Sequence, residues 1–223
     1  MEIRQWPEGW VTRAAGMDDV GRVLELMNAR SQRLYGENQI TREDIEAWWK
    51  SPWLDLDKDM RLVLDARGNL AGIANIGNPG EPYADISCAG VTHPLCEGRS
   101  DVWDWMHEWS LERARELVPL APEGIRVAGS SAIAKQDRAR AAALERAGFS
   151  AVRVANHMRI DLSSEIPAPR WPEGVSVRTV NVERDLRGIV ALYFESWRDH
   201  WGFIERPFDQ VLSDWREQIE SEG

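Results

Sequence analysis

The stretch from Val91 to Glu116 constrains the fold of this chain more than any other, because it predicts the end of a strand, a short loop and a long helix. The loop Cys96–Asp101 lies where some α/β folds hold a phosphate against a helix N-terminus. The first N–H groups of a helix lack intrahelical acceptors, and glycines let the backbone approach the anion. Gly98 is the only glycine in the loop. The sequence therefore predicts a loop at the position of such a phosphate-binding loop, but one that lacks most of the glycines that binding needs.

Strands and helices alternate on both sides of this unit. Strands are predicted from alternating apolar residues at Trp10–Ala14, Met60–Asp65, Asn69–Ile76, Tyr83–Val91, Ile125–Ala128 and Phe149–Leu162. Further helices are predicted after Asp18–Asp19, after a capping box at Thr41–Asp44, and over Ala134–Arg146, with Gly148 as the C-cap. This order predicts an α/β (α+β) fold with a mixed, mostly antiparallel sheet flanked by helices.

The beginning of the chain is repeated after a linker at 163–170 that is rich in Pro and Ser. Trp6-Pro-Glu-Gly9 returns as Trp171-Pro-Glu-Gly174. With one residue inserted, Asp19 then matches Asp185. A single repeat with so long a period indicates a duplicated domain rather than a solenoid.

We therefore expect a first domain over residues 1–162 and the opening strand and two helices of a second, incomplete domain over residues 171–223. Such a fragment cannot bury its apolar faces alone. It is expected to pack on the first domain, to belong to a longer protein, or to pair with another chain as a homodimer or by strand exchange.

Composition excludes several classes of protein. The net charge of −10 argues against a nucleic-acid partner. No apolar run is long enough to cross a membrane, and the N-terminus lacks the apolar core of a signal peptide. Cys88 and Cys96 are the only cysteines, so neither a disulfide framework nor a zinc site is expected. A cytoplasmic location and no metal are predicted.

Three segments, together with this order of elements, resemble a known superfamily: Thr92-His93-Pro94 followed by Gly98-Arg99, then Leu144–Phe149 (LERAGF), and Glu195–Phe203 in the repeat. The chain resembles the GNAT superfamily of acyl-CoA-dependent N-acyltransferases. It is most similar to the bacterial tandem GNAT proteins, a group that includes mycothiol synthase. In these proteins a degenerate N-terminal domain precedes a more functional C-terminal one.

The resemblance implies acetyl-CoA as the cofactor. In the family a loop of the type R/Q-x-x-G-x-G/A wraps the pyrophosphate with backbone N–H groups at a helix start. Carried over to this sequence, the cofactor-binding positions are Val91, Thr92, Gly98, Arg99 and Ser100. The alternative is an ordinary strand-to-helix turn in which a polar residue caps the helix.

The first domain departs from the family pattern in the loop before the long helix and in a later helix. Arg99, Asp101 and Trp103 stand where the family usually has glycine. Leu144 stands where the family often has a Tyr that protonates the leaving thiolate, and an aliphatic side chain cannot donate a proton. The first domain is therefore expected to be degenerate and inactive.

Catalytic candidates remain at two places. Asp85 opens a strand, where it could face an amine as a base or lie at a solvated strand end. Asp199, His200, Trp201 and Glu205 form a polar and aromatic cluster in the repeat, and the resemblance implies that this region contacts the acceptor substrate. Glu205 could deprotonate an amine through water. Alternatively, the aromatic rings seal helix against sheet and the charges lie at the rim.

Three other polar residues have structural interpretations. His93 precedes Pro94 and is expected to be structural, and His107 is expected to be packed or exposed on its helix rather than catalytic. Cys88 is expected to be a small buried apolar residue.

Two functions from different classes follow. The first is an N-acyltransferase that moves an acetyl group from acetyl-CoA to a small primary amine by direct attack on the thioester, with catalysis in the second domain. The second is a non-catalytic GNAT-like scaffold or interaction domain that has lost acetyl-CoA binding.

Overall fold

The computed structural model describes residues 8–51, 53–77, 82–156, 158, 160–163 and 165–222. The chain divides into two compact units, unit 1 (Met1–Ala151) and unit 2 (Val152–Gly223), and each is described by itself. The part of the predicted repeat at Trp6, and His157 and Arg159 in the predicted last strand, lie outside the described residues.

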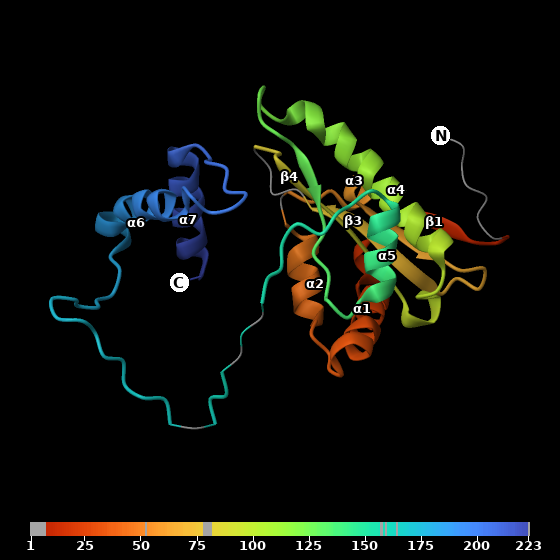
Figure 1. Ribbon diagram of the computed structural model, residues 1–223, viewed down its shortest axis with the longest axis horizontal. Helices are drawn as coiled ribbons and strands as arrows, with labels where there is room; N and C mark the ends of the chain where they lie inside the picture. The colour runs from red at the N-terminus through yellow and green to blue at the C-terminus, as the bar shows by residue number, and fades with distance from the viewer. Residues whose placement is uncertain are drawn as a thin grey trace. The chain divides into compact units, whose positions relative to one another are not determined.

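Unit 1 contains one five-stranded sheet with helices on both faces (Figure 1). The strands are β1 (Val11–Ala14), β2 (Met60–Leu64), β3 (Leu70–Gly77), β4 (Asp85–Thr92) and β5 (Ala128–Ser130). The helices are α1 (Val20–Tyr35), α2 (Arg42–Trp49), α3 (Leu56–Asp59), α4 (Ser100–Leu117) and α5 (Arg138–Arg146), with 3₁₀ turns η1 (Met17–Asp19), η2 (Pro94–Cys96) and η3 (Val118–Leu120). Strand order is β1-β2-β3-β4-β5, and only β4 and β5 are parallel. The predicted mixed, mostly antiparallel sheet is confirmed.

Alternation along the strands divides the core into two layers. Leu62 and Ile73 pair across β2 and β3 and pack with α1 and α2. Their neighbours Val63 and Ala74 point to the other face and pack under α4. Successive side chains of a strand point to opposite faces, so one sheet buries a layer of helices on each side.

The predicted capping box of α2 is confirmed, Gly148 lies one residue beyond the C-cap Ala147 of α5, and α4 begins after Arg99 rather than after a polar cap at Ser100 or Asp101. Thr41 Oγ1 accepts from Asp44 N at 3.2 Å, and the Asp44 carboxylate accepts from Thr41 N at 2.8 Å. Gly148 has φ +91°, a left-handed conformation that favours glycine, and Phe149 N donates to the Leu144 carbonyl at 3.0 Å. Each helix end therefore has acceptors or donors for the backbone groups that the helix leaves unpaired.

Two predicted boundaries are corrected, and one short helix was not predicted. The fifth strand is Ala128–Ser130 rather than Ile125–Ala128. Helix α5 begins at Arg138 rather than Ala134, because the Asp137 carboxylate accepts from Arg140 N at 3.2 Å and caps the helix there. Helix α3 was not predicted, because a helix of only four residues leaves no periodic pattern.

The predicted last strand, Phe149–Leu162, is wrong for the described residues, none of which is in a strand. Phe149 packs against the core of unit 1, but the later apolar residues do not reach a core: Val152 is 73% exposed and Val154 is 80% exposed. A strand needs a hydrogen-bonding neighbour, and alternating apolar residues alone do not supply one.

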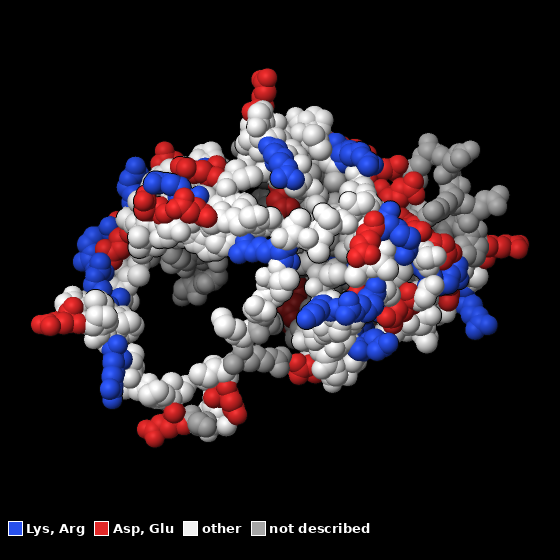
Figure 2. Space-filling view, viewed as in Figure 1, with Lys and Arg blue, Asp and Glu red and all other residues white. Residues whose placement is uncertain are grey.

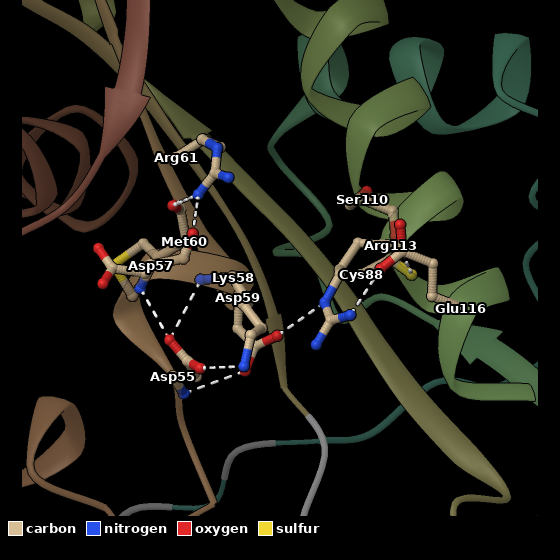
Figure 3. Close-up of polar contacts among 10 residues, drawn as sticks. All are labelled: Asp55, Asp57, Lys58, Asp59, Met60, Arg61, Cys88, Ser110, Arg113 and Glu116. Atoms are coloured by element: carbon tan, nitrogen blue, oxygen red, sulfur yellow. Dashed lines mark hydrogen bonds and ion pairs between the residues drawn. The ribbon is translucent and has the colours of Figure 1, made fainter. Parts of the chain in front are cut away.

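A buried ion pair ties α3 and the start of β2 to α4 (Figure 3). Arg113 Nε donates to Asp59 Oδ1 at 2.9 Å, and Asp59 Oδ2 accepts from Asp55 N at 3.0 Å. The side chains of Asp59 and Arg113 are only 11% and 19% exposed. Removing either partner leaves a charge that is largely shielded from water.

We expect Asp59→Asn to lower the free energy of unfolding by about 2 kcal/mol, because the mostly buried charge of Arg113 then keeps only its ion pair with the exposed Glu116. Urea denaturation followed by tryptophan fluorescence measures the change. Lys58→Gln is the matched control on the same helix: its ion pair with Asp55 is exposed, so we expect a change within about 0.5 kcal/mol. Equal losses in the two variants would contradict the assignment.

Unit 2 contains two helices, α6 (Val182–Trp197) and α7 (Phe208–Glu222). Leu186 and Val190 of α6 pack against Val211 of α7. The two predicted helices of the repeat are thus present, while the preceding residues 175–180 form no strand.

An arginine–aspartate contact occurs in the same form in both units. In unit 1, Arg13 Nη1 and Nη2 donate to Asp19 Oδ2 and Oδ1 at 2.7 and 2.6 Å. In unit 2, Arg178 Nη1 and Nη2 donate to Asp185 Oδ2 and Oδ1 at 2.5 and 3.0 Å. The accompanying contacts also match, from Arg13 to the Ala14 carbonyl, Arg178 to the Thr179 carbonyl, Gly16 N to Asp19 and Asn181 N to Asp185.

The face of the molecule in Figure 2 shows acidic and basic side chains interspersed. No helix in the described part of the chain is long and apolar enough to cross a membrane.

Candidate functional site

The sheet opens between β4 and β5, and this opening is the candidate site. The two strands pair only over Asp85–Ser87 and Ala128–Ser130. The Ala84 carbonyl accepts from Ala128 N at 2.9 Å, so every second residue of β4 after Ala84 faces the β5 side. Gly90 belongs to this series and lies beyond the paired part. Its backbone N–H and C=O therefore point into the opening.

A cavity of about 140 Å³ lies in this opening. Its lining includes Gly90 and Val91 of β4, Arg30 of α1, Trp103 of α4 and Arg140 of α5. Elements from four parts of the sequence thus contribute to one small, polar and aromatic space.

A buried ion pair crosses the opening. Arg30 Nη2 donates to the Asp137 carboxylate, and the two side chains are only 6% and 4% exposed. The Arg30 guanidinium also lies over the Trp103 ring, 6.0 Å from its centroid, and its Nη1 is 3.5 Å from Glu97 Oε2. The pair joins α1 to the first turn of α5 and occupies space between β4 and β5.

The start of α4 is occupied by a carboxylate of the chain itself. Arg99 Nε and Nη2 donate to Asp101 Oδ1 and Oδ2 at 2.9 and 2.5 Å. The Asp101 carboxylate also interacts with the backbone N–H groups of Asp101 and Val102. The Arg99 guanidinium is the main cause that lowers the pKa of Asp101. The positive end of α4 therefore already holds an anion.

Three N–H groups of the loop before α4 are hydrogen-bonded within the loop. Cys96 N donates to the His93 carbonyl at 2.8 Å, Glu97 N to Pro94 at 3.2 Å and Arg99 N to Cys96 at 2.9 Å. Trp103 is 1% exposed and its Nε1 donates to the Glu97 carbonyl at 3.1 Å. An acyl-CoA pyrophosphate needs free N–H groups and open space at a helix start, but three of the loop's N–H groups are bonded within the loop, Asp101 occupies the helix start and Trp103 is buried behind the loop. The loop does not fit that cofactor.

The structure separates the predicted cofactor-binding residues. Val91 lines the cavity, whereas Thr92 is fully buried and pairs with Gly72 of β3. Gly98 and Ser100 are exposed at the start of α4. Arg99 forms the ion pair with Asp101 and lies over the Trp10 ring, 4.7 Å from its centroid.

The predicted catalytic and substrate residues lie elsewhere. Asp85 is exposed at the first residue of β4, roughly 17 Å along the strand from Gly90 at the usual rise per residue. Asp199, His200, Trp201 and Glu205 are exposed in the loop between α6 and α7 of unit 2. The His200 ring packs against Trp197 with centroids 4.3 Å apart.

Sequence reasoning missed Arg30 and Asp137, although each leaves a signal. Arg30 follows the buried Val23 and Leu26 at helical spacing, so it is a charged residue on the core-facing side of α1. Asp137 immediately precedes a helical run and is a preferred N-cap type. Their pairing joins residues 107 positions apart, which no local pattern shows.

His107 of α4 is buried, which agrees with the first of the two structural roles expected for it, packing within the helix layer. It is fully buried, it stacks on Trp103, and neither ring nitrogen has a hydrogen-bond partner in the described part of the chain. Burial lowers its pKa to about 4; Arg140 and Arg146 act in the same direction and Asp104 opposes them. The ring is therefore neutral near neutral pH.

We expect His107 to make unit 1 sensitive to acid. The unfolded chain takes up a proton on this ring below about pH 6.5, while the folded chain resists until about pH 4, so stability falls across that interval. The pKa difference corresponds to a loss of about 3 kcal/mol. Urea denaturation at several pH values, compared with His107→Met, isolates this contribution: the variant should lose less stability on acidification. Parallel pH profiles would contradict it.

No protein-family model matches the chain, and no curated protein matches it. Solved structures do match. A GCN5-related N-acetyltransferase from Sphaerobacter thermophilus aligns with 97% of this chain at 24% identity and a TM-score of 0.82. The chain spans 66% of that protein, less than two thirds of its length.

A second match is yncA from Salmonella typhimurium, whose structure contains its cofactor acetyl-CoA. It is 15% identical with a TM-score of 0.52, and the alignment covers 66% of this chain and 82% of that one. The chain therefore has the fold of the GCN5-related N-acetyltransferases, and the predicted fold is confirmed.

Proposed function

We propose that this chain is part of an acyl-CoA-dependent N-acyltransferase built from two domains of this fold, with catalysis in the second domain. The observation that carries the proposal is the repeated contact of Arg13 with Asp19 and of Arg178 with Asp185. In each unit an arginine four residues after a glycine joins an extended segment to the start of a long helix. The alignment with the longer Sphaerobacter protein covers both units and supports the same organisation.

Within this enzyme, unit 1 is proposed to be a scaffold that holds no acetyl-CoA. Asp101 occupies the helix start, Trp103 fills the space behind the loop, and Arg30 with Asp137 crosses the opening of the sheet. Leu144, at the family's Tyr position, is buried. The non-catalytic scaffold, which the sequence offered as the alternative function, is thus proposed for unit 1 alone.

Unit 2 is proposed to open the catalytic domain. Asp199, His200, Trp201 and Glu205 lie together after α6, where exposed polar groups are accessible to a small primary amine. Glu205 is the proposed base. The apolar faces of unit 2 are proposed to be covered by further parts of that domain, or by a second chain through strand exchange. A cytoplasmic location is part of the proposal and accords with the two free cysteines.

We expect acetyl-CoA to leave the thermal unfolding of this chain unchanged at millimolar concentration, because the Asp101 carboxylate occupies the start of α4 where the phosphates would bind. Differential scanning fluorimetry measures this, with the acetyl-CoA-binding yncA protein as the positive control. A saturable rise in the melting temperature that Arg99→Gln abolishes would show that unit 1 does bind the cofactor.

We expect the gene to encode, beyond the codon of Gly223, a loop of the type R/Q-x-x-G-x-G/A at a helix start and a later Tyr. These supply the phosphate-binding N–H groups and the acid that unit 1 lacks. Sequencing the gene past this codon tests the prediction. With the longer protein in hand, release of CoA in the presence of primary amines tests the activity, and an immediate stop codon would overturn the two-domain proposal.

A further inference from the structure

The cavity between β4 and β5 contains buried arginine N–H groups without acceptors. Arg140 Nε is buried and makes no hydrogen bond to any described residue. Arg30 Nη1 is also buried without a hydrogen bond, and its nearest carboxylate is Glu97, at an ion-pair distance of 3.5 Å. The Arg30 side chain is 6% exposed, and both residues line the cavity. Buried donors without acceptors are costly, so their presence beside a cavity points to an occupant that accepts hydrogen bonds.

The charges around the cavity favour an anion. Asp137 pairs with Arg30, and Glu97 lies 3.5 Å from Arg30 and 3.6 Å from Arg33. Arg140 Nη2 donates to the Ser131 hydroxyl, which is neutral. Among the residues that line the cavity, Arg30 and Arg140 are positive and Asp137 is the one carboxylate, whereas Arg33 and Glu97 lie outside the lining and Arg33 is 62% exposed. Burial lowers the pKa of Arg140, a cost that a bound anion would offset.

The rest of the cavity suits a ligand with a small apolar body. Leu34, Val91, Trp103, Ala132 and Ala134 line it, and Gly90 directs backbone groups into it. A volume of about 140 Å³ is too small for a nucleotide. A doubly charged phosphate would lose more hydration against these apolar walls than a singly charged carboxylate.

We propose that this cavity binds a short-chain monocarboxylate. Its carboxylate accepts hydrogen bonds from Arg140 Nε and Arg30 Nη1, and its alkyl group lies against Leu34, Val91 and Trp103. Unit 1 would then keep the opening of an acyltransferase fold but fill it with a small free acid. This goes beyond the proposed function, which assigns no ligand to unit 1.

Saturation-transfer NMR of the whole chain with sodium propionate tests the proposal, with sodium phosphate in a parallel arm. We expect saturable propionate binding and none for phosphate. Arg140→Gln removes the donor and its charge, so it should weaken binding about tenfold or more. Arg138→Gln is the matched control, since Arg138 is exposed on the same helix and does not line the cavity.

Ala134→Leu fills the cavity without changing a charge, and it too should abolish propionate binding. Circular dichroism checks that each variant is folded. The absence of propionate binding to the unchanged chain overturns the proposal. Phosphate binding without propionate binding overturns the carboxylate class, and unchanged affinity in both Arg140→Gln and Ala134→Leu overturns the location. The acetyl-CoA titration is independent, so either proposal can fail alone.

Discussion

The ion pair between Arg30 and Asp137 is the interaction on which the geometry of unit 1 depends most. It joins α1, which covers one face of the sheet, to the N-cap of α5, which lies beside α4 on the other. Both side chains are nearly excluded from water, so neither charge can be left unpaired without a cost of about 3–5 kcal/mol. The pair therefore ties α1 to the start of α5 beside the place where β4 and β5 part.

A fold associated with one ligand can keep its architecture while its residues exclude that ligand. The strands still part after Ser87, as the fold requires. At the helix start, however, Asp101 and Arg99 satisfy each other, and the dipole of α4 is met by a carboxylate within the chain. Function here is decided by a few side chains rather than by the fold.

The sequence predicted most of the fold because most of it follows from local chemistry. The capping box at Thr41–Asp44 and the alternation in β2 and β3 depend on residues that are close in the chain. The last strand failed because pairing needs a neighbour that periodicity does not show. The site was predicted only in part. The sequence showed that Asp101 stands where the family's loop usually has glycine. The pairing of Arg30 with Asp137 joins distant residues, so only the structure shows it.

Two features of the chain serve different purposes: an arginine–aspartate contact that shapes the backbone, and loop glycines that serve a ligand. The contact of Arg13 with Asp19 joins the end of β1 to the turn before α1, and Arg178 and Asp185 form the same contact at the start of α6. The glycines of a phosphate loop serve only the ligand, and nothing in the packing of α4 requires them. Trp103, at a position where the family usually has glycine, fills the core of unit 1 instead, so the packing of α4 gains an apolar contact where the loop loses flexibility.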